Sequence, residues 1–384
     1  MRLTEPELAD RWRAARAPAD VVHLDSAAAA RSSRAVVAAV TAHLQLEARI
    51  GGYVAAELAQ PAIDELRGGL GALLGRAPGD VAFTESAAAS LRALLDAWPL
   101  SAGARVLVSA GEYGPNLASF IHRGLDVRVA AAVDEVGHLD PATFAGELDR
   151  HRPDLVHLCA IGAHRGVVQP LAALVEACHA AGVAVVVDAA QAVGHLDCRV
   201  GADAIYGTSR KWLAGPRGVG FLAVRPDLAA RLRPAGTDAR PAGGDTGPSS
   251  IAALESSEAF VAGRVGLAVA VAEHLAAGPD RIRASLAAIG AHTRAVLHGV
   301  GGWSVVEPER EPSAITTLRP PTGRDDDRVA AARRALLDRH HILLTYAGPQ
   351  RAPRQVSRAT LRISPHVDVT TEQIDALARA LPHC

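Results

Sequence analysis

The sequence contains little cysteine. Its four cysteines, Cys159, Cys178, Cys198 and Cys384, are spread widely along 384 residues. So sparse a set gives no basis for a disulfide framework and does not show the spacing of a metal site, so we predict neither. A reducing compartment fits this content, and we expect a cytoplasmic protein.

Long apolar runs are also missing. No window approaches the roughly 18 uninterrupted apolar residues that a membrane span needs, so none is predicted. The stretch 1–16 is charged throughout and lacks the apolar centre of a signal peptide. The apolar stretch 265–277 is short and is interrupted by Glu273 and His274, which is typical of a core helix.

Neither sign of charge dominates, because 40 lysine and arginine residues face 41 aspartate and glutamate residues. This balance gives no electrostatic basis for binding nucleic acid or an acidic membrane. Hydrophobic residues make up 49% of the chain and charged residues 21%, which indicates a packed globular protein. Aromatic residues account for only 3%, so the core must consist mainly of Ala, Val and Leu.

Short apolar runs alternate with helical stretches over the first two thirds of the chain, which predicts an α/β fold with a mostly parallel sheet. A Gly- and Pro-rich stretch at 234–248 is typical of a loop at a domain junction. We expect an N-terminal segment (1–20) that packs with the small domain, a large domain (21–250) and a smaller α+β domain (251–384). Strand-like runs are 81–83, 105–109, 127–131, 155–161, 183–188, 204–206, 219–224, 303–306, 314–318, 342–345 and 360–363, and helix-like stretches include 86–97, 170–181, 257–277 and 280–299.

One strand-like run ends abruptly in a carboxylate, in Val183-Ala-Val-Val-Val-Asp188-Ala-Ala-Gln191. In open α/β sheets, ligands bind beyond the carboxyl ends of the strands. A carboxylate there suits a cation such as the protonated pyridine nitrogen that pyridoxal phosphate (PLP) needs to act as an electron sink. The alternative is that Asp188 only caps a turn or a helix, and this residue alone does not decide between the two.

The chain's only lysine, Lys211, lies in the motif Thr208-Ser-Arg-Lys211-Trp-Leu-Ala-Gly. A lysine that forms a Schiff base must be partly neutral, so it needs a shielded, cation-rich site that lowers its pKa. Arg210 supplies positive charge beside it, and Arg210 and Thr208 offer donors for a phosphate. A surface lysine is the alternative, but a single lysine surviving in this motif favours a chemical role.

Three further segments carry candidate ligand-binding residues. Ser86, Ala87 and Ala88 open a helix-like stretch after a strand-like run, where free backbone N–H groups form an anion site and Ser86 suits the N-cap. Tyr113 follows another such run and can stack on a flat ring, although a core tyrosine is the simpler interpretation. Arg362 suits a bidentate grip on a carboxylate, unless it is an edge-strand arginine that faces solvent.

In their order along nearly the whole chain, these segments resemble fold-type I PLP enzymes of the class V aminotransferase and cysteine desulfurase superfamily. The resemblance implies that Lys211 forms the Schiff base, Asp188 pairs with the pyridinium nitrogen and Gln191 bonds the phenolic oxygen. It also implies a homodimer with the site at the subunit interface. The other implied roles are phosphate binding by Thr208, Arg210 and the Ser86-Ala87-Ala88 backbone, cofactor stacking by Tyr113 and α-carboxylate binding by Arg362.

Two departures from the family pattern bear on the substrate. Arg210 stands where the family often has histidine before the lysine. The stretch Ala163-His164-Arg165-Gly166 stands where the family often has asparagine, which hints at an altered substrate and makes His164 a candidate substrate contact.

Longer phrases are similar to the bacterial C–S lyases of ergothioneine biosynthesis. This resemblance implies β-elimination from hercynylcysteine sulfoxide, an amino-acid-derived small molecule, to give an ergothioneine sulfur species, pyruvate and ammonia. Aromatic faces attract the trimethylammonium group of such a substrate, which makes Tyr53 and Tyr346 candidate contacts. The phrases are Gly51-Gly-Tyr-Val-Ala-Ala-Glu57, Gly111-Glu-Tyr-Gly-Pro-Asn116, His164-Arg-Gly166, Ser209-Arg-Lys-Trp-Leu-Ala-Gly-Pro-Arg-Gly-Val-Gly220 and Leu361-Arg-Ile-Ser-Pro-His-Val-Asp-Val-Thr370.

Other reactions on the same scaffold stay open, namely transamination, epimerisation and desulfuration. A desulfurase needs a nucleophilic thiol on a loop, and the stretch 345–358 contains no cysteine. Cys159 is a candidate proton donor, although a buried structural thiol is the simpler interpretation. The retained Lys211, Asp188 and Arg362 argue against a non-catalytic protein that merely keeps the fold.

Overall fold

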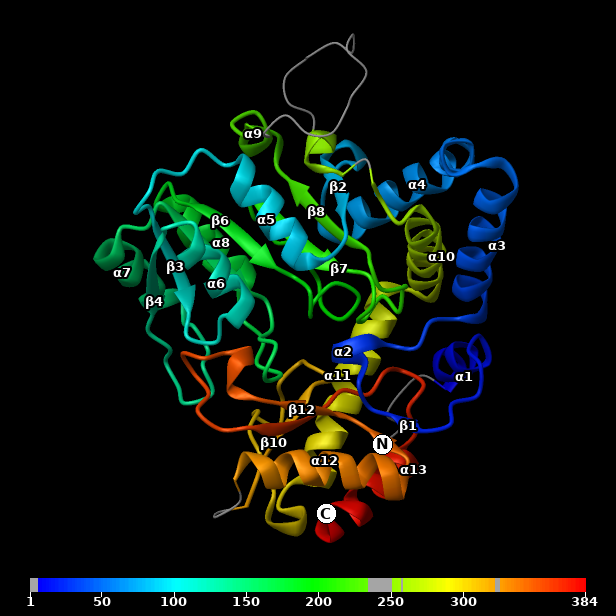
Figure 1. Ribbon diagram of the computed structural model, residues 1–384. Coiled ribbons are helices and arrows are strands. Elements are labelled where there is room, and N and C mark those ends of the chain that lie inside the picture. The colour runs from blue at the N-terminus through cyan, green and yellow to red at the C-terminus, as the bar shows by residue number, and fades with distance from the viewer. Residues whose placement is uncertain (1–5, 234–250, 257, 322–324) are drawn as a thin grey trace.

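The computed structural model describes residues 6–233, 251–256, 258–321 and 325–384 (Figure 1). The loop predicted at 234–248 lies outside the described residues. The helices are α1 Pro6–Ala14, α2 Ser26–Ala29, α3 Arg34–Ile50, α4 Gly52–Leu74, α5 Ala87–Ala97, α6 Gly114–His122, α7 Pro141–His151, α8 Leu171–Ala180, α9 Pro226–Ala229, α10 Val261–Ala277, α11 Pro279–Leu297, α12 Asp326–His340 and α13 Thr371–Ala380. The strands are β1 Val22–His23, β2 Val81–Thr84, β3 Arg105–Ser109, β4 Asp126–Ala130, β5 Leu155–Cys159, β6 Ala184–Asp188, β7 Ala204–Thr208, β8 Gly220–Val224, β9 Ser304–Val305, β10 Thr316–Arg319, β11 Ile342–Leu343, β12 Thr345–Ala347 and β13 Thr360–Ile363.

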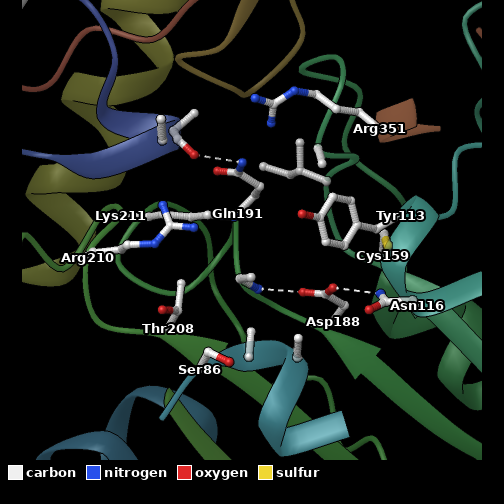
Figure 2. A pocket seen from close by; sticks show the side chains of 17 residues that line it. Ser86, Tyr113, Asn116, Cys159, Asp188, Gln191, Thr208, Arg210, Lys211 and Arg351 are labelled. Carbon is white, nitrogen blue, oxygen red and sulfur yellow. Dashed lines mark hydrogen bonds between the residues drawn. The ribbon is translucent and has the colours of Figure 1, made fainter. Parts of the chain in front are cut away.

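The large sheet has seven strands in the order β2-β8-β7-β6-β5-β3-β4. β4, β3, β5, β6 and β7 run parallel, whereas β8 pairs antiparallel with both β7 and β2. This arrangement confirms the predicted α/β fold with a mostly parallel sheet. The carboxyl ends of the parallel strands meet along one edge of the sheet, where β6 ends at Asp188 (Figure 2).

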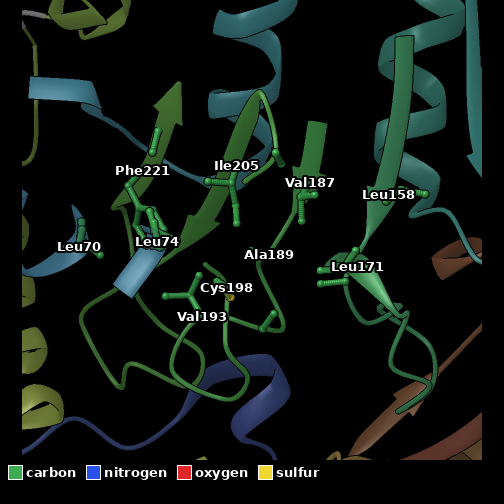
Figure 3. Close-up of a cluster of buried hydrophobic side chains, with 14 of the residues drawn as sticks. Leu70, Leu74, Leu158, Leu171, Val187, Ala189, Val193, Cys198, Ile205 and Phe221 are labelled. Atoms are coloured by element: carbon green, nitrogen blue, oxygen red, sulfur yellow. The ribbon is translucent and has the colours of Figure 1, made fainter. Parts of the chain in front are cut away.

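Helices cover both faces of this sheet, because successive side chains of a buried strand point to opposite faces. On one face, Val187, Ile205 and Phe221 from three neighbouring strands belong to the same buried cluster as Leu70 and Leu74 of α4 (Figure 3). The opposite face packs against α5 and α6. Fully burying one such side chain contributes roughly 1.5–3 kcal/mol, so the two apolar layers together hold the strand ends in place.

The C-terminal part contains a four-stranded antiparallel sheet, β12-β13-β10-β9, packed against α11, α12 and α13. Leu8 and Trp12 of α1 lie in the same core, and β1 pairs with β11. The predicted domain boundaries stay a prediction. α10 contributes Leu267 and Val271 to the core of the large sheet, while Ala277 at its end packs against the second core.

The predicted core helix at 265–277 is part of α10, which is largely buried. Among the described residues, α10 and α11 have the length and apolar composition of a membrane span only when taken together, and a bend of 83° separates them. No single described helix has those properties alone.

One predicted strand is wrong, because the run 342–345 divides between two sheets. β11 pairs in parallel with β1, whereas β12 pairs antiparallel with β13, with Thr345 opposite Arg362. Leu344, between the two strands, is fully buried. A continuous apolar run shows that a segment is buried, but it does not show which neighbour each residue pairs with.

Candidate active site

A cavity lies at the carboxyl edge of the large sheet, and residues from distant parts of the chain line it (Figure 2). Nine residues predicted to bind the cofactor meet there: Ser86, Ala87, Ala88, Tyr113, Asp188, Gln191, Thr208, Arg210 and Lys211. The remaining lining residues are Ala27, Ala28, Asn116, Cys159, Ile161, Ala163, Ala190 and Arg351.

Lys211 reaches the cavity from the loop after β7, and its side chain is partly buried there. Burial lowers the pKa of Lys211 to about 7, Asp188 opposes this shift, and the positive charges of Arg210, Arg362 and Arg351 reinforce it. A large share of the amine is therefore neutral at pH 7, which is the form that attacks a carbonyl or accepts a proton. The cation-rich environment expected from the sequence is present.

Asp188 ends β6 with both carboxylate oxygens engaged. Oδ1 accepts the backbone N–H of Ala190 at 2.8 Å, and Oδ2 accepts Nδ2 of Asn116 at 3.0 Å. Asp188 therefore does cap the turn that follows β6, as the alternative expected, but capping is not its only contact. The same side chain also lines the cavity. In the strand register Asp188 stands opposite Cys159 on one side and Tyr206 on the other.

Behind Asp188 lies a buried polar network that consists of Glu112, Asn116, His157 and Tyr206. Asn116 donates to Glu112 Oε1 at 2.9 Å, and His157 Nδ1 lies 2.8 Å from Glu112 Oε2. His157 Nε2 lies 2.9 Å from the Tyr206 hydroxyl. Tyr206 in turn interacts with the Asp188 carboxylate, so the network leads back to Asp188. Glu112, His157 and Tyr206 are fully buried, so this is a ring of polar groups inside one face of the sheet.

The centre of the network is an ion pair. Burial lowers the pKa of His157, but the charges of Glu112 and Asp188 and the hydrogen bond to Glu112 outweigh it, so the pKa is raised. Burial raises the pKa of Glu112, but His157 and the hydrogen bonds from Asn116 and Cys159 lower it below its usual range. Both net shifts favour the charged forms, as expected for two buried groups that solvate each other.

Cys159 lines the cavity, and its thiol donates a hydrogen bond to Glu112 Oε1, with 3.1 Å between the sulfur and the oxygen. Burial and the charges of Glu112 and Asp188 raise the pKa of its thiol well above the ordinary value. A thiol whose proton is held in this way is a poor nucleophile.

Gln191 is oriented by two fixed partners. The indole N–H of Trp212 donates to Oε1 at 3.2 Å, and Nε2 donates to the carbonyl of Ala27 at 3.0 Å. An indole N–H can only donate, so the amide oxygen is assigned to that side. One N–H of Gln191 remains available to the cavity, as the predicted bond to a phenolic oxygen requires.

The N-terminus of α5 lines another end of the cavity. Ser86 is the N-cap, and its hydroxyl accepts the N–H of Ala89 at 3.2 Å, which confirms the predicted cap. Gly220 at the start of β8 packs tightly beneath this turn, since a Cβ there would lie 2.3 Å from the Ser86 carbonyl carbon. Thr208 and Arg210 line the same cavity. A helix N-terminus with hydroxyl and guanidinium groups nearby is suited to a phosphate.

Arg362 lies behind the wall of the cavity. The edge-strand alternative is wrong, because β13 runs between β12 and β10 and the side chain is fully buried. Its Nη1 donates to the carbonyl of Ala163, and Nη2 lies 3.4 Å from Thr345 Oγ1 and 3.9 Å from Asp25. Burial and then the charge of Arg351 lower its pKa to about 9. Its Nε has no hydrogen-bond partner among the described residues.

The other three predicted substrate contacts, His164, Tyr53 and Tyr346, do not line this cavity. His164 is buried, and its Nε2 lies 2.8 Å from Gln355 Oε1. Burial and then Arg165 lower the pKa of His164 to about 3, so the imidazole is neutral. Tyr53, on α4, is 83% exposed in the single chain. The substrate roles of all three residues stay predictions.

Sequence reasoning missed Asn116, Arg351 and the rest of the polar network as parts of the site. One available signal was rarity, since Asn116 is the only asparagine just as Lys211 is the only lysine. Another was the presence of His157 and Tyr206 inside otherwise apolar strand-like runs. Arg351 gave no signal, because the chain contains many arginines.

Residues 22–377 match the family model described as Aminotransferase class-V, so the chain belongs to this family of PLP-dependent enzymes. Relatives include a Mycobacterium tuberculosis protein named probable hercynylcysteine sulfoxide lyase, 50% identical over 97% of this chain and 93% of its own. An isopenicillin N epimerase from Amycolatopsis lactamdurans is 27% identical over 94% of each chain. On these relationships the chain is a PLP-dependent carbon–sulfur lyase.

Solved structures share the fold. The cysteine desulfurase CsdA from Escherichia coli superposes with a TM-score of 0.84 at 21% identity, covering 98% of each chain. The cysteine desulfurase from Thermococcus onnurineus NA1 gives 0.82 at 21% identity, covering 95% of this chain and 94% of its own. These matches confirm the fold-type I architecture.

The residues present fit PLP. The cavity offers a buried, partly neutral lysine, a carboxylate for a ring nitrogen, an aromatic ring in Tyr113 and an anion-binding helix start. Bound PLP supplies an electron sink for charge that develops at the substrate α-carbon. We propose Lys211, Asp188, Gln191 and the α5 turn as the groups that hold it.

The lowered pKa of Lys211 predicts how the apoprotein captures PLP with pH. Because the amine loses its proton near pH 7 rather than near 10.4, the capture rate should rise through pH 7 and then level off. Stopped-flow absorbance from pH 5.5 to 9.5 measures this rate, and a free lysine derivative mixed with PLP corrects for ionisation of the cofactor. A rate that still climbs steeply above pH 9 would contradict the assignment.

Removing the asparagine that bridges the two carboxylates should loosen the cofactor site. In Asn116→Ala, Asp188 loses the hydrogen bond that Asn116 donates to its Oδ2, and a hydrogen bond to a charged group contributes about 1.5–3 kcal/mol. We expect at least about tenfold weaker PLP binding and a shifted cofactor absorbance band, measured by titration of the apoprotein. Ser119→Ala, a change of a half-buried residue on the same helix whose hydroxyl donates to the Pro115 carbonyl, should leave both unchanged.

Proposed function

We propose that this lyase acts on hercynylcysteine sulfoxide, cleaving the bond between its β-carbon and sulfur to give an ergothioneine sulfur species, pyruvate and ammonia. The observation that carries the proposal is the meeting of Lys211 and Asp188 in a cavity whose walls offer arginines but no reactive thiol. The 50% identical relative named probable hercynylcysteine sulfoxide lyase supports the choice of substrate.

In this proposal each group of the chain has one task. Arg362 holds the substrate α-carboxylate by exchanging its bond to the Ala163 carbonyl for one to the substrate. Lys211 Nζ, released when the substrate amine takes its place, accepts the α-proton. Asp188, restrained by Asn116, would pair with the positive ring nitrogen of bound PLP, and loss of the α-proton would prepare the β-carbon–sulfur bond to break.

Desulfuration is the less suitable alternative. It needs a thiolate that attacks the substrate sulfur, and the loop 345–358 has no cysteine. Cys159 does not replace it, because its proton is held by Glu112 and its pKa is raised. Elimination requires no protein thiol, so it agrees with the groups that the cavity presents.

We also infer that the enzyme is a cytoplasmic homodimer, with α3 and α4 at the interface. Large apolar side chains are exposed on these two helices. A monomer would leave this apolar surface in contact with water, whereas a second subunit would bury it. Tyr53 lies in this surface, so it would reach a site only across the subunit boundary. The exposed residues are Val37, Leu44, Ile50, Tyr53, Val54 and Leu58.

Incubation with hercynylcysteine sulfoxide tests the reaction. The wild-type enzyme loaded with PLP should release pyruvate and an ergothioneine sulfur species, detected by coupled lactate dehydrogenase and by mass spectrometry. Lys211→Ala should lose this turnover by at least about 10³-fold, since both its nucleophilic and its proton-accepting roles vanish. Retained turnover in this variant would remove Lys211 from the mechanism, and an inactive wild type would remove the substrate.

A charge placed on the apolar surface tests the homodimer. Leu58→Glu should shift the molar mass measured by light scattering from two chains towards one, because Leu58 is 63% exposed within that surface. Ile121→Glu is the matched control, since Ile121 is 59% exposed but lies on α6. A wild type that elutes as one chain, or equal effects of the two variants, would contradict the interface.

A further inference from the structure

The loop after β12 places an arginine in the cavity. Arg351 ends the short 3-10 turn Pro349–Arg351 and lines the cavity together with Lys211 and Tyr113. Figure 2 shows it at the opposite end from Ser86 and Thr208, which form the phosphate end. Arg351 is therefore on the substrate side of the cofactor site.

The loop is held rigidly in this position. Gly114 at the start of α6 is packed against it, because a Cβ there would lie 2.2 Å from the carbonyl oxygen of Gln350. Gln355 donates to the Val136 carbonyl at 3.2 Å and meets His164 Nε2 at 2.8 Å. The imidazole of His164 is neutral, so Nε2–H donates to Gln355 and keeps one tautomer. A side chain on so fixed a loop loses little freedom when it binds a ligand.

Arg351 has no acidic partner in the part of the chain that the structure describes. No hydrogen bond or ion pair of its guanidinium is present there, although the side chain is only partly exposed. Arg362 lies close enough for the charge of Arg351 to affect its pKa, and Nη2 of Arg362 lies 3.9 Å from Asp25. Of these two guanidinium groups at the substrate end, Arg362 alone has a carboxylate within ion-pair distance among the described residues.

This surplus of positive charge exceeds what one α-carboxylate needs. The α-carboxylate of an amino acid satisfies Arg362 and leaves Arg351 without a counter-charge. A guanidinium is always charged and favours planar, bidentate acceptors such as a carboxylate. Hercynylcysteine sulfoxide carries a second carboxylate on its betaine part, distant from the carbon that loses its proton.

We propose that Arg351 binds a second, distal carboxylate of the substrate, so that the enzyme selects amino-acid derivatives with a carboxylate at each end. The identity of the natural ligand rests on the proposed function, but the selectivity itself does not. In this arrangement Arg351 sets specificity, and His164 acts through Gln355 as a positioning residue for the loop.

Unreactive amino acids test the selectivity separately from the reaction. The PLP-loaded enzyme is titrated with L-norleucine, L-2-aminoadipate and L-2-aminopimelate, and the change in cofactor absorbance gives each Kd. Arg351→Gln should weaken the two dicarboxylates about 10-fold or more and leave L-norleucine within about twofold. The matched control is Arg354→Gln, an exposed arginine on the same loop, which should change none of the three.

The outcomes separate the two ideas. Equal weakening of all three ligands in Arg351→Gln, or no weakening of either dicarboxylate, overturns the distal-carboxylate site. With turnover substrates, Arg351→Gln should raise KM for hercynylcysteine sulfoxide and leave KM for S-methyl-L-cysteine sulfoxide unchanged. If the wild type does not cleave hercynylcysteine sulfoxide, the proposed reaction fails, while the amino-acid titrations still decide the role of Arg351.

Discussion

The site depends on the desolvation of Lys211, whose side chain is partly buried where it lines the cavity. Burial brings the pKa of this amine to about 7, against the opposing pull of Asp188. The two groups have conflicting requirements, because the carboxylate that a cofactor ring nitrogen needs also favours a charged lysine. Desolvation and the charges of the surrounding arginines outweigh Asp188 far enough for a large share of the amine to be neutral at pH 7.

The buried network serves the other half of this pair. A carboxylate at a strand end is free to rotate, but Asp188 is fixed by Asn116 and Ala190. Asn116 is in turn held by Glu112, whose negative charge is balanced by His157. Breaking a buried ion pair costs about 3–5 kcal/mol, so the network persists only as a complete set. Part of one face of the sheet is therefore polar rather than apolar, and these polar groups hold a single carboxylate in place.

The sequence was sufficient to predict the groups at strand ends, for a geometrical reason. In a parallel α/β sheet every strand delivers its carboxyl end to the same edge, so Asp188 and Tyr113 are expected at the same edge of the sheet. The polar network depends instead on which strands are neighbours. Cys159, Asp188 and Tyr206 lie side by side only because β6 runs between β5 and β7. Sequence order does not give that adjacency, so His157 and Tyr206 were not recognised, and the division of 342–345 was missed for the same reason.

The distribution of charge along the cavity favours different ligand groups at its two ends. One end offers a helix start and Arg210, the middle offers Lys211 beside Asp188, and the far end offers Arg351 with Arg362 behind the wall. A dianionic phosphate and an anionic substrate are thus drawn to opposite ends, with the amine between them. In the proposed arrangement, the loop 345–358 presents Arg351 to the distal part of the substrate. A thiol at that place would attack sulfur, whereas a guanidinium cannot take part in bond exchange and can only hold a charged leaving group as the carbon–sulfur bond breaks.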